Sequence, residues 1–433
     1  MPKIEDYTKL TEEAIDYITD VCNKFGPRIS GTKEERESLE ELETILQPIS
    51  DFTYFDSYKV YPTFYPGGFV TILGILVILG VITFFFRGLW ALLSLFLPLF
   101  GLFIFFVSLV LMKYWFAFLS KKGISHNATG RILPRSPNGE TVSGKLKIVI
   151  AGHMDSAFQM KITRFGDKSA FFFKSSIAYI VSIAILSALK VAIVQLTNIE
   201  YILSVGIFGL TWIDFVFLAI SVVGFPVFVI TLLGFIGGTP VLGANDNLSG
   251  VGLALTLGKY FSKDENRLNN VELWVGSFGS EECGERGSNY FIQKYSKMGL
   301  LNDSIAVIPE SLGAGTHLAI LTKELMHLAT HDITVCKELE NAYVSLVNEV
   351  GKENVVQCGI APDLKMGASD GGRFALAGYS SSTLVGYEGT KTMKPANWHN
   401  IQDTSENLSK NIFRTAIGIY IHFIKMMDKK LDL

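Results

Sequence analysis

Hydrophobic and polar positions divide the chain into three hydrophilic blocks separated by two strongly apolar blocks, at residues 68–119 and 170–236. The run Phe69–Phe86 has no polar face, which argues against a buried helix of a soluble domain. Short polar breaks at Arg87–Gly88 and Thr197–Tyr201 divide each apolar block into two arms. Each arm is long enough to cross a hydrocarbon core, which needs roughly 20 apolar residues. The pattern therefore predicts two transmembrane hairpins with four spans.

The hydrophilic blocks carry the mixed strand and helix patterns of an α/β domain. Apolar positions at helical spacing predict a first helix around residues 10–21, and a second helix over residues 34–46 follows the turn-like segment GPRISGT. Short apolar runs predict buried strands at residues 148–151, 271–275 and 305–309. We therefore expect a three-layer α/β/α domain, with a mixed sheet covered by helices on both faces.

The inserts make this predicted domain discontinuous. It takes residues 1–67, 120–169 and 237–433, and the two hairpins take residues 68–119 and 170–236. If the hydrophilic blocks form one domain, both ends of each insert lie on the same side of the membrane. Each insert then crosses an even number of times, and two hairpins are the simplest solution.

Composition supports a membrane protein. Hydrophobic residues make up 49% of the chain and charged residues 18%, whereas average soluble chains carry about 25% charged residues. The net charge of −3 gives no reason to expect nucleic acid as a partner. The four cysteines form no CxxC pair, so neither a disulfide framework nor a thiolate zinc site is expected. The charged N-terminus lacks the apolar run of a secretory signal.

Basic residues near the predicted spans predict the orientation, because cytoplasmic loops carry an excess of lysine and arginine. On the side of the α/β domain they are Lys59, Lys121, Lys122, Arg164, Lys168 and Lys174, and on the far side Arg87 and Lys190. We therefore expect a multi-pass integral membrane protein whose α/β domain faces the cytoplasm. Asp214, within the second apolar block, is either a functional acid or a residue at a bilayer surface or helix contact.

Residues that suit metal ligands follow the predicted strands. The strand at 148–151 ends in Gly152-His153-Met154-Asp155, and open α/β sheets place their sites at the carboxyl ends of strands. His153 is a candidate ligand, with Asp155 as the partner of its other ring nitrogen. The alternative is a histidine hydrogen-bonded at a strand end. Asp246, in GANDNLSGVG, is either a helix N-cap, as Asn247 also could be, or a carboxylate that bridges two cations.

Two adjacent carboxylates, Glu281 and Glu282, follow the predicted strand at residues 271–275. Neighbouring carboxylates repel each other unless a cation or a proton compensates their charge. One of the pair is therefore predicted to bind a metal and the other to handle protons. Glu285, a few residues further on, is interpreted as part of a solvated acidic loop.

Two further candidates lie later in the chain. Glu310 follows the predicted strand at residues 305–309, and His399 precedes a terminal amphipathic helix for which Asp403 or Thr404 is the expected cap. The remaining histidines have no comparable setting and are interpreted as surface or core residues: His126, His317, His327, His331 and His422.

The order of these motifs resembles the dizinc exopeptidase family that includes bacterial leucyl aminopeptidase and glutamate carboxypeptidase, metallopeptidase family twenty-eight. The segments GPRISGTKEERESLEELETIL and GASDGGRFALAG are also similar to that family, and only the apolar inserts lie outside the resemblance. The resemblance implies two zinc ions, one bound by His153 and Glu310, the other by Glu282 and His399, with Asp246 bridging. It also implies that Glu281 is the general base and that Asp155 supports His153. The family commonly has aspartate where this chain has Glu310.

The implied activity is release of N-terminal residues from peptides by a membrane-embedded zinc aminopeptidase. Its expected partners are a peptide substrate and the lipid bilayer, with no nucleic acid; the oligomeric state is not predicted. Three alternatives stay open: a receptor-like relative without catalysis, a glutaminyl cyclase on the same fold, and a transporter. Only the spans and Asp214 suggest the transporter, and the chain has no internal repeat.

Overall fold

The computed structural model describes residues 4–432 except 137, 198–200, 362–366 and 389–394. The predicted polar break at Thr197–Tyr201 therefore lies partly outside the described residues. The chain folds as two compact units. The α/β unit contains residues 1–62, 121–159 and 239–433, and the helical unit contains residues 63–120 and 160–238.

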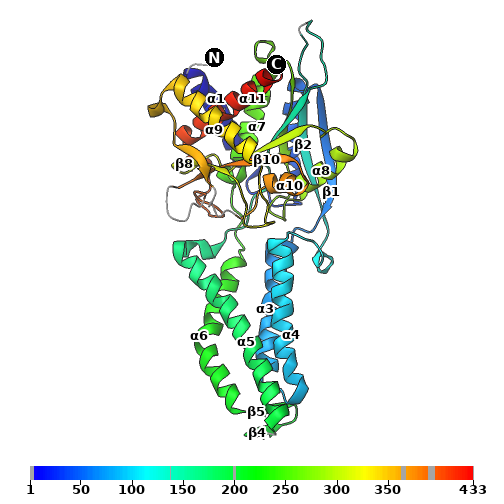
Figure 1. Cartoon of the computed structure of the whole chain (residues 1–433), viewed down its shortest axis with the longest axis vertical. Helices are drawn as coiled ribbons and strands as arrows, with labels where there is room; N and C mark the ends of the chain where they lie inside the picture. Colours follow the sequence, from blue (N-terminus) through cyan, green and yellow to red (C-terminus); the bar gives the residue numbers. More distant parts are fainter. Residues whose placement is uncertain (1–3, 137, 198–200, 362–366, 389–394, 433) are drawn as a thin grey trace. The chain divides into compact units, whose positions relative to one another are not determined.

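A mixed sheet forms the centre of the α/β unit (Figure 1). Its described strands have the order β1-β2-β6-β3-β7-β10-β8-β9. They are β1 (Phe52–Val60), β2 (Gly123–Ile132), β3 (Leu146–His153), β6 (Val271–Phe278), β7 (Ser304–Glu310), β8 (His317–Leu321), β9 (Cys358–Ala361) and β10 (Ser380–Tyr387). Strands β6, β3, β7 and β10 run parallel to one another, and β1–β2, β2–β6 and β10–β8 are antiparallel pairs.

The parallel strands have apolar sequences because both faces of this part of the sheet are covered. Every residue of β6 is buried, and β3 and β7 are buried over most of their length. Strands buried on both faces read as continuous hydrophobic runs. The predictions of strands at 148–151, 271–275 and 305–309 are confirmed, and each observed strand is longer than its apolar run.

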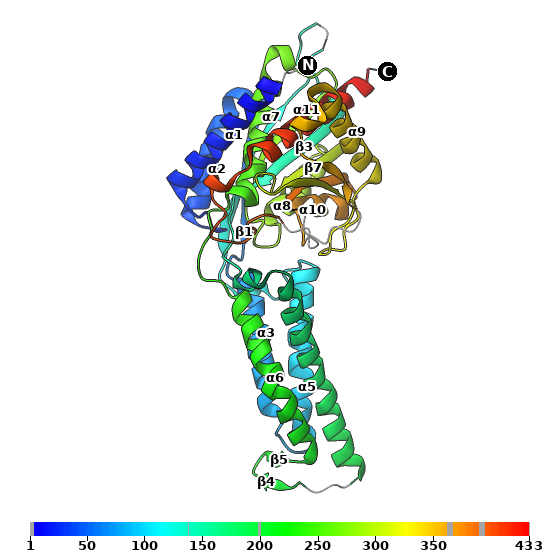
Figure 2. The ribbon, with the colours of Figure 1, turned by 90° about the vertical axis from the view of Figure 1, so that its left-hand side faces the viewer.

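Helices cover both faces of the sheet (Figure 2). One core cluster joins the sheet to helices α1, α2, α7, α9 and α11, and a second, containing Trp274 and Phe291, joins it to α8 and α10. The helices are α1 (Ile4–Phe25), α2 (Lys33–Leu46), α7 (Ser249–Ser262), α8 (Arg286–Lys297), α9 (Ile333–Val350), α10 (Asp370–Leu376) and α11 (Lys410–Lys430). The predicted mixed sheet with helices on both faces is confirmed.

The helical unit is built from the two apolar blocks. Its long helices are α3 (Phe69–Thr83), α4 (Leu93–Phe105), α5 (Ser169–Thr197) and α6 (Trp212–Phe235), and the short strands β4 (Leu203–Val205) and β5 (Phe208–Leu210) pair with each other. Many large apolar side chains on these helices are exposed, for example Phe96 at 60% and Val222 at 74%. Exposed apolar surface of this extent indicates contact with a partner or a membrane.

Three helical segments among the described residues are long and apolar enough to cross a membrane: Gly88–Val110, Ser169–Thr197 and Trp212–Phe235. They contain 23, 29 and 24 residues. Helix α3 is also apolar but has only 15 residues, fewer than the roughly 20 that span a hydrocarbon core. The structure therefore gives three candidate spans, and the predicted count of four is not confirmed.

Asp214 has a buried partner inside the helical unit. The Lys190 ammonium group on α5 lies 2.6 Å from Asp214 Oδ1 and also donates to the carbonyl oxygens of Phe84 and Gly209. The other oxygen, Asp214 Oδ2, accepts hydrogen bonds from the backbone N–H and the hydroxyl of Thr211, which form a capping box at the start of α6. Both members of the ion pair are 1% exposed or less. Of the two interpretations of Asp214, the structure favours a helix contact.

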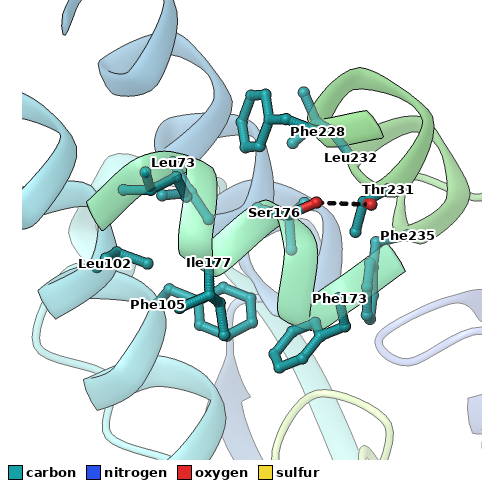
Figure 3. A pocket seen from close by; sticks show the side chains of 12 residues that line it. Leu73, Leu102, Phe105, Phe173, Ser176, Ile177, Phe228, Thr231, Leu232 and Phe235 are labelled. Atoms are coloured by element: carbon teal, nitrogen blue, oxygen red, sulfur yellow. Dashed lines mark hydrogen bonds between the residues drawn. The ribbon is translucent and has the colours of Figure 1, made fainter. Parts of the chain in front are cut away.

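A small apolar pocket opens among the four helices of this unit (Figure 3). Leu73, Leu102, Phe228 and other apolar side chains line it. The polar side chains in its lining are Ser176 and Thr231, whose hydroxyl groups are hydrogen-bonded to each other at 2.8 Å. The polar groups in this apolar bundle are thus paired between helices, as expected where water is excluded.

Candidate metal centre

The predicted ligands follow the carboxyl ends of three neighbouring parallel strands. His153 is the last residue of β3, Glu310 is the last residue of β7, and Glu281 and Glu282 follow the end of β6. Parallel strands end at the same edge of a sheet, which is where α/β folds place their sites. This arrangement explains how residues far apart in the sequence come together.

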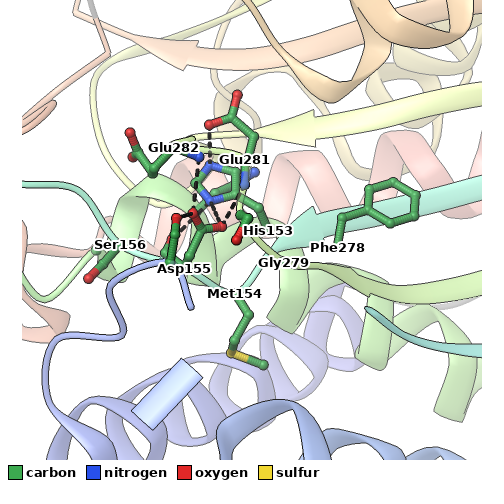
Figure 4. Close-up of polar contacts among 12 residues, drawn as sticks. His153, Met154, Asp155, Ser156, Phe278, Gly279, Glu281 and Glu282 are labelled. Carbon is green, nitrogen blue, oxygen red and sulfur yellow. Dashed lines mark hydrogen bonds and ion pairs between the residues drawn. The ribbon is translucent and has the colours of Figure 1, made fainter. Parts of the chain in front are cut away.

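Asp246 lies between the two candidate histidines. Its Oδ1 is 3.3 Å from His153 Nε2, and its Oδ2 is 3.5 Å from His399 Nε2. Glu282 Oε1 is 3.2 Å from His399 Nε2, and Glu281 Oε2 is 3.8 Å from His153 Nε2 (Figure 4). Each carboxylate oxygen of Asp246 therefore faces a different imidazole, the arrangement that a bridging ligand needs.

Asp246 does not cap a helix. Helix α7 begins at Ser249, and it is the side chain of Asn247 that accepts a hydrogen bond from the N–H of Gly250, at 3.0 Å. The amide nitrogen of Asn247 donates to Glu310 Oε2 at 3.1 Å. Asn247 thus takes the capping role and orients Glu310, which leaves the carboxylate of Asp246 directed at the histidines.

The carboxylates are packed in surroundings that disfavour their charge. Burial raises the pKa of Glu281, Glu282 and Glu310, and the charge of neighbouring carboxylates adds to this effect. Burial lowers the pKa of His153 and His399, but the facing carboxylates outweigh it and raise both pKa values above the usual range. The cluster thus has more negative charge than its own cationic side chains balance.

The donor atoms fit a metal ion. Ligand atoms of His153, Asp246 and Glu282 lie within 4.8 Å of one another. Asp246 Oδ2 and Glu282 Oε1 are buried and accept no hydrogen bond within the described part of the chain, although the His399 imidazole faces both. A cation would supply the partner that these oxygens lack. Imidazole nitrogen and carboxylate oxygen are ligands that suit zinc.

Asp155 supports the site through a different atom from the one predicted. The ring nitrogen His153 Nδ1 is 2.9 Å from the backbone carbonyl oxygen of Asp155, whereas the carboxylate is 3.6 Å away. The carboxylate instead accepts hydrogen bonds from the N–H groups of Glu281 and Glu282, at 2.9 and 3.0 Å, and from the hydroxyl of Ser30 at 2.6 Å. Asp155 therefore orients the glutamate loop as well as the histidine.

The prediction that Asp403 or Thr404 caps the terminal helix is wrong. Helix α11 begins at Lys410, after Ser409. The Asp403 carboxylate instead accepts hydrogen bonds from the N–H groups of Asn245 and Asp246, at 2.6 and 3.1 Å. Burial and the charge of Asp246 raise the pKa of Asp403 to about 7.

Glu35 is a functional candidate that the sequence did not single out. It is fully buried, and its Oε1 accepts hydrogen bonds from the Ser280 N–H and the Ser125 hydroxyl, both at 2.8 Å. Burial and the charge of Asp155 raise the pKa of Glu35 to about 8. Its segment resembles the family, but only the fold places it beside the loop of Glu281.

The remaining histidines do not join the cluster. His126 stacks on Phe55, His317 contacts Thr316, and His422 contacts Tyr7. His327 and His331 are core residues, paired with the carboxylates of Glu285 and Glu324. The interpretation of Glu285 as a solvated residue is wrong, because its side chain is completely buried.

The fold and the cluster define an α/β protein with a candidate metal centre at the carboxyl ends of its parallel strands. A similar solved structure is a zinc aminopeptidase from Bacillus subtilis, with 12% sequence identity, and the match covers 96% of this chain and 95% of that one. An aminopeptidase from Aneurinibacillus sp. strain AM-1 has 14% identity, with 97% of this chain and 94% of that chain covered. A glutaminyl cyclase from Bacteroides thetaiotaomicron has 13% identity, with 98% of each chain covered. The TM-score is 0.53 for each. Residues 229–424 match the family model described as peptidase family M28, which agrees with the resemblance found in the sequence. Among curated proteins, no sequence matches this chain.

Proposed function

We propose that the protein is a membrane-embedded, zinc-dependent aminopeptidase that releases N-terminal residues from peptides with two zinc ions. The observation that carries this proposal is the position of Asp246 between His153 and His399, with one carboxylate oxygen toward each. In this proposal His153 and Glu310 would hold one zinc, Glu282 and His399 would hold the other, and Asp246 would be shared between the two. The family match and the aminopeptidases of the same fold support a metallopeptidase.

The proposed reaction assigns separate roles to the bound zinc and to Glu281. Bound zinc would polarise the scissile carbonyl and lower the pKa of a water molecule from about 15.7 toward about 7. Glu281, beside His153, would accept a proton from the attacking water and transfer it to the departing amine. Burial raises the pKa of Glu281, which makes its carboxylate a stronger proton acceptor than that of an exposed glutamate.

The helical unit would hold the enzyme in the bilayer. Three candidate spans and exposed apolar side chains support this part of the proposal. The excess of basic residues on the side of the α/β domain favours a cytoplasmic active site. A cysteine-accessibility measurement on intact cells would test the orientation, because labelling of an exposed position in the α/β unit by an impermeant reagent would exclude a cytoplasmic domain.

The test of the activity uses the full chain in detergent or lipid nanodiscs. Zinc content is measured together with the release of N-terminal residues from a panel of unblocked and N-acetylated peptides. We expect two zinc ions per chain, cleavage of unblocked peptides only, and loss of cleavage in Glu281→Gln with zinc retained. Glu265→Gln, at an acid outside the site, is the matched control and should keep wild-type activity. A zinc-loaded wild type that cleaves no peptide would contradict the proposal and favour a receptor-like relative.

Glutaminyl cyclisation is the second candidate, because a glutaminyl cyclase has the same TM-score as the aminopeptidases. Both activities use zinc and a peptide with a free N-terminus, so peptides that begin with glutamine separate them. A cyclase would release ammonia and leave the peptide chain intact, whereas an aminopeptidase would release free glutamine. One zinc per chain would also favour the cyclase.

A further inference from the structure

The segment that carries Glu281 and Glu282 ends in a tight turn closed by Glu285. The N–H groups of Gly284 and Glu285 both donate to the carbonyl oxygen of Glu281, each at 2.7 Å. Glu285 has a positive φ of 55° and immediately precedes helix α8. The conformation of Glu281 is therefore coupled directly to the position of Glu285.

Two basic side chains from separate parts of the fold, His327 and Arg373, hold the Glu285 carboxylate. His327 Nε2, from the loop between β8 and α9, lies 2.6 Å from Oε1 and 2.5 Å from Oε2. Arg373 Nε, from helix α10, lies 2.7 Å from Oε2. Burial raises the pKa of Glu285, but the charges of His327 and Arg373 outweigh it and keep the pKa below its usual range.

Arg373 also holds the main chain of the turn, because its Nη2 donates to the carbonyl oxygen of Gly284 at 3.2 Å. Glu285 meanwhile makes no side-chain hydrogen bond to cap helix α8, although it occupies the N-cap position. Its charge is thus directed away from the local helix and toward remote elements. Burying a charge costs free energy. Because Glu285 does not cap α8, a local role in that helix does not explain why the charge is buried.

We propose that Glu285, His327 and Arg373 are positioning residues that fix the 281–285 turn and thereby aim Glu281 and Glu282 at the metal centre. Asp155 and Glu35 hold the first part of the segment, at Ser280, Glu281 and Glu282. The buried ion cluster holds its far end. The predicted effect on catalysis rests on the proposed function. The restraint on the 281–285 turn does not depend on the proposed function.

A matched control lies on the same strand that leads into this loop. Glu272, near the start of β6, is completely buried and forms a bidentate pair with Arg131, at 2.6 and 2.9 Å. Glu272 is thus another buried carboxylate paired with an arginine, but it lies at the opposite end of the strand from Glu281. Its loss should cost stability without altering the 281–285 turn.

The experiment compares Glu285→Gln with Glu272→Gln in the zinc-loaded full chain. We expect Glu285→Gln to lower kcat roughly ten- to hundred-fold, the scale of effect that small misplacement of catalytic groups produces. KM and zinc content should stay close to wild type, and the pH profile of kcat should shift because Glu281 is less restrained. Glu285→Asp should recover part of the loss. Glu272→Gln should leave kcat and its pH profile unchanged.

Amide hydrogen exchange makes the outcome independent of peptide cleavage. Exchange at Gly284 and Glu285, whose amides close the turn, should become faster in Glu285→Gln and stay at the wild-type rate in Glu272→Gln. If the wild type cleaves no peptide, the proposed function fails while exchange still tests the restraint. Wild-type exchange and kcat in Glu285→Gln would overturn the inference, and so would an equal loss of kcat in Glu272→Gln. If Glu285→Gln does not fold, Arg373→Lys takes its place, because it keeps the charge and removes the contact with Gly284.

Discussion

Arg28 provides a stringent test of how the site is built, through the substitution Arg28→Lys. The side chain is completely buried, and its guanidinium group makes three short hydrogen bonds to backbone carbonyl oxygens: Met154 at 2.9 Å, Gly26 at 2.7 Å and Leu242 at 2.8 Å. A fourth, longer contact of 3.5 Å reaches the carbonyl oxygen of Gly243. Met154 follows His153, and Leu242 precedes the segment that carries Asp246. One guanidinium group therefore ties together two of the segments that carry predicted metal ligands.

The expected loss of stability follows from the geometry of these donors. Guanidinium nitrogens spread over a planar fork, whereas a lysine ammonium group is a single point of charge on a flexible stem. The substituted lysine is expected to satisfy one of the three carbonyl groups and to leave two buried carbonyls without their charged partner. At about 1.5–3 kcal/mol for each hydrogen bond to a charged group, the loss is roughly 3–6 kcal/mol. This is a large part of the roughly 5–15 kcal/mol by which typical domains are stable.

The assay is native-state hydrogen exchange of the β3 amides across a urea titration, with the zinc-loaded protein in detergent. Arg36→Lys is the control, because Arg36 is half exposed and pairs with exposed Glu40 on helix α2. Such surface pairs are worth about 0–1 kcal/mol. A free-energy change below about 1 kcal/mol in Arg28→Lys, well under the cost of one buried charged hydrogen bond, would refute the role assigned to the guanidinium group.

Two further predictions concern the metal centre and the helical unit. Because the facing carboxylates raise the pKa values of His153 and His399 in the metal-free site, protons compete with zinc for both imidazoles more strongly than for exposed histidines. Zinc binding should therefore release protons and weaken as the pH falls; calorimetry in buffers of different ionisation enthalpy measures this, and binding without proton release would contradict it. Lys190→Met should destabilise the helical unit by about 3–5 kcal/mol, because Asp214 is left as a buried charge without its partner. Adding Asp214→Asn should recover part of that loss in a mixed-micelle unfolding assay, and equal losses in the single and double variants would show that the ion pair is not responsible.

The sequence was sufficient to predict the three buried strands β3, β6 and β7 and the order of candidate ligands, because both depend on local pattern. Strand β3 is an apolar run that ends in His153, and β7 is another that ends in Glu310. Parallel strands place such residues at one edge, so their convergence followed from the predicted fold. The α/β class was predictable for the same reason, whereas the resemblance to the family rested on the order of the motifs along the chain.

The supporting contacts were not predictable, because they join residues far apart in the chain. Asp403 reaches the N–H of Asn245 across 158 positions, and its local sequence suggested only a helix cap. Glu285 lies in a polar stretch that is typical of an exposed loop, and its partners Arg373 and His327 come from elements that no nearby pattern connects to it. From local sequence alone, a helix cap is the best prediction for Asp403 and a solvated loop is the best prediction for Glu285. Only their tertiary contacts show otherwise.

The buried charges explain why protons and metal ions compete for this site. Eight carboxyl side chains lie in or beside it with little or no exposure: Glu35, Asp155, Asp246, Glu281, Glu282, Glu310, Asp370 and Asp403. The nearby basic groups are fewer, namely Arg28, His153 and His399, and both oxygens of Asp370 lack a hydrogen bond within the described part of the chain. Buried charge without compensation is unstable, and burial together with the charge of neighbouring carboxylates raises the pKa values of Glu281, Glu310 and Asp370. Bound divalent cations would supply positive charge there and would compete with protons for the same carboxylates. Metal affinity, proton uptake and the order of the ligand loops are therefore linked through the same carboxylates.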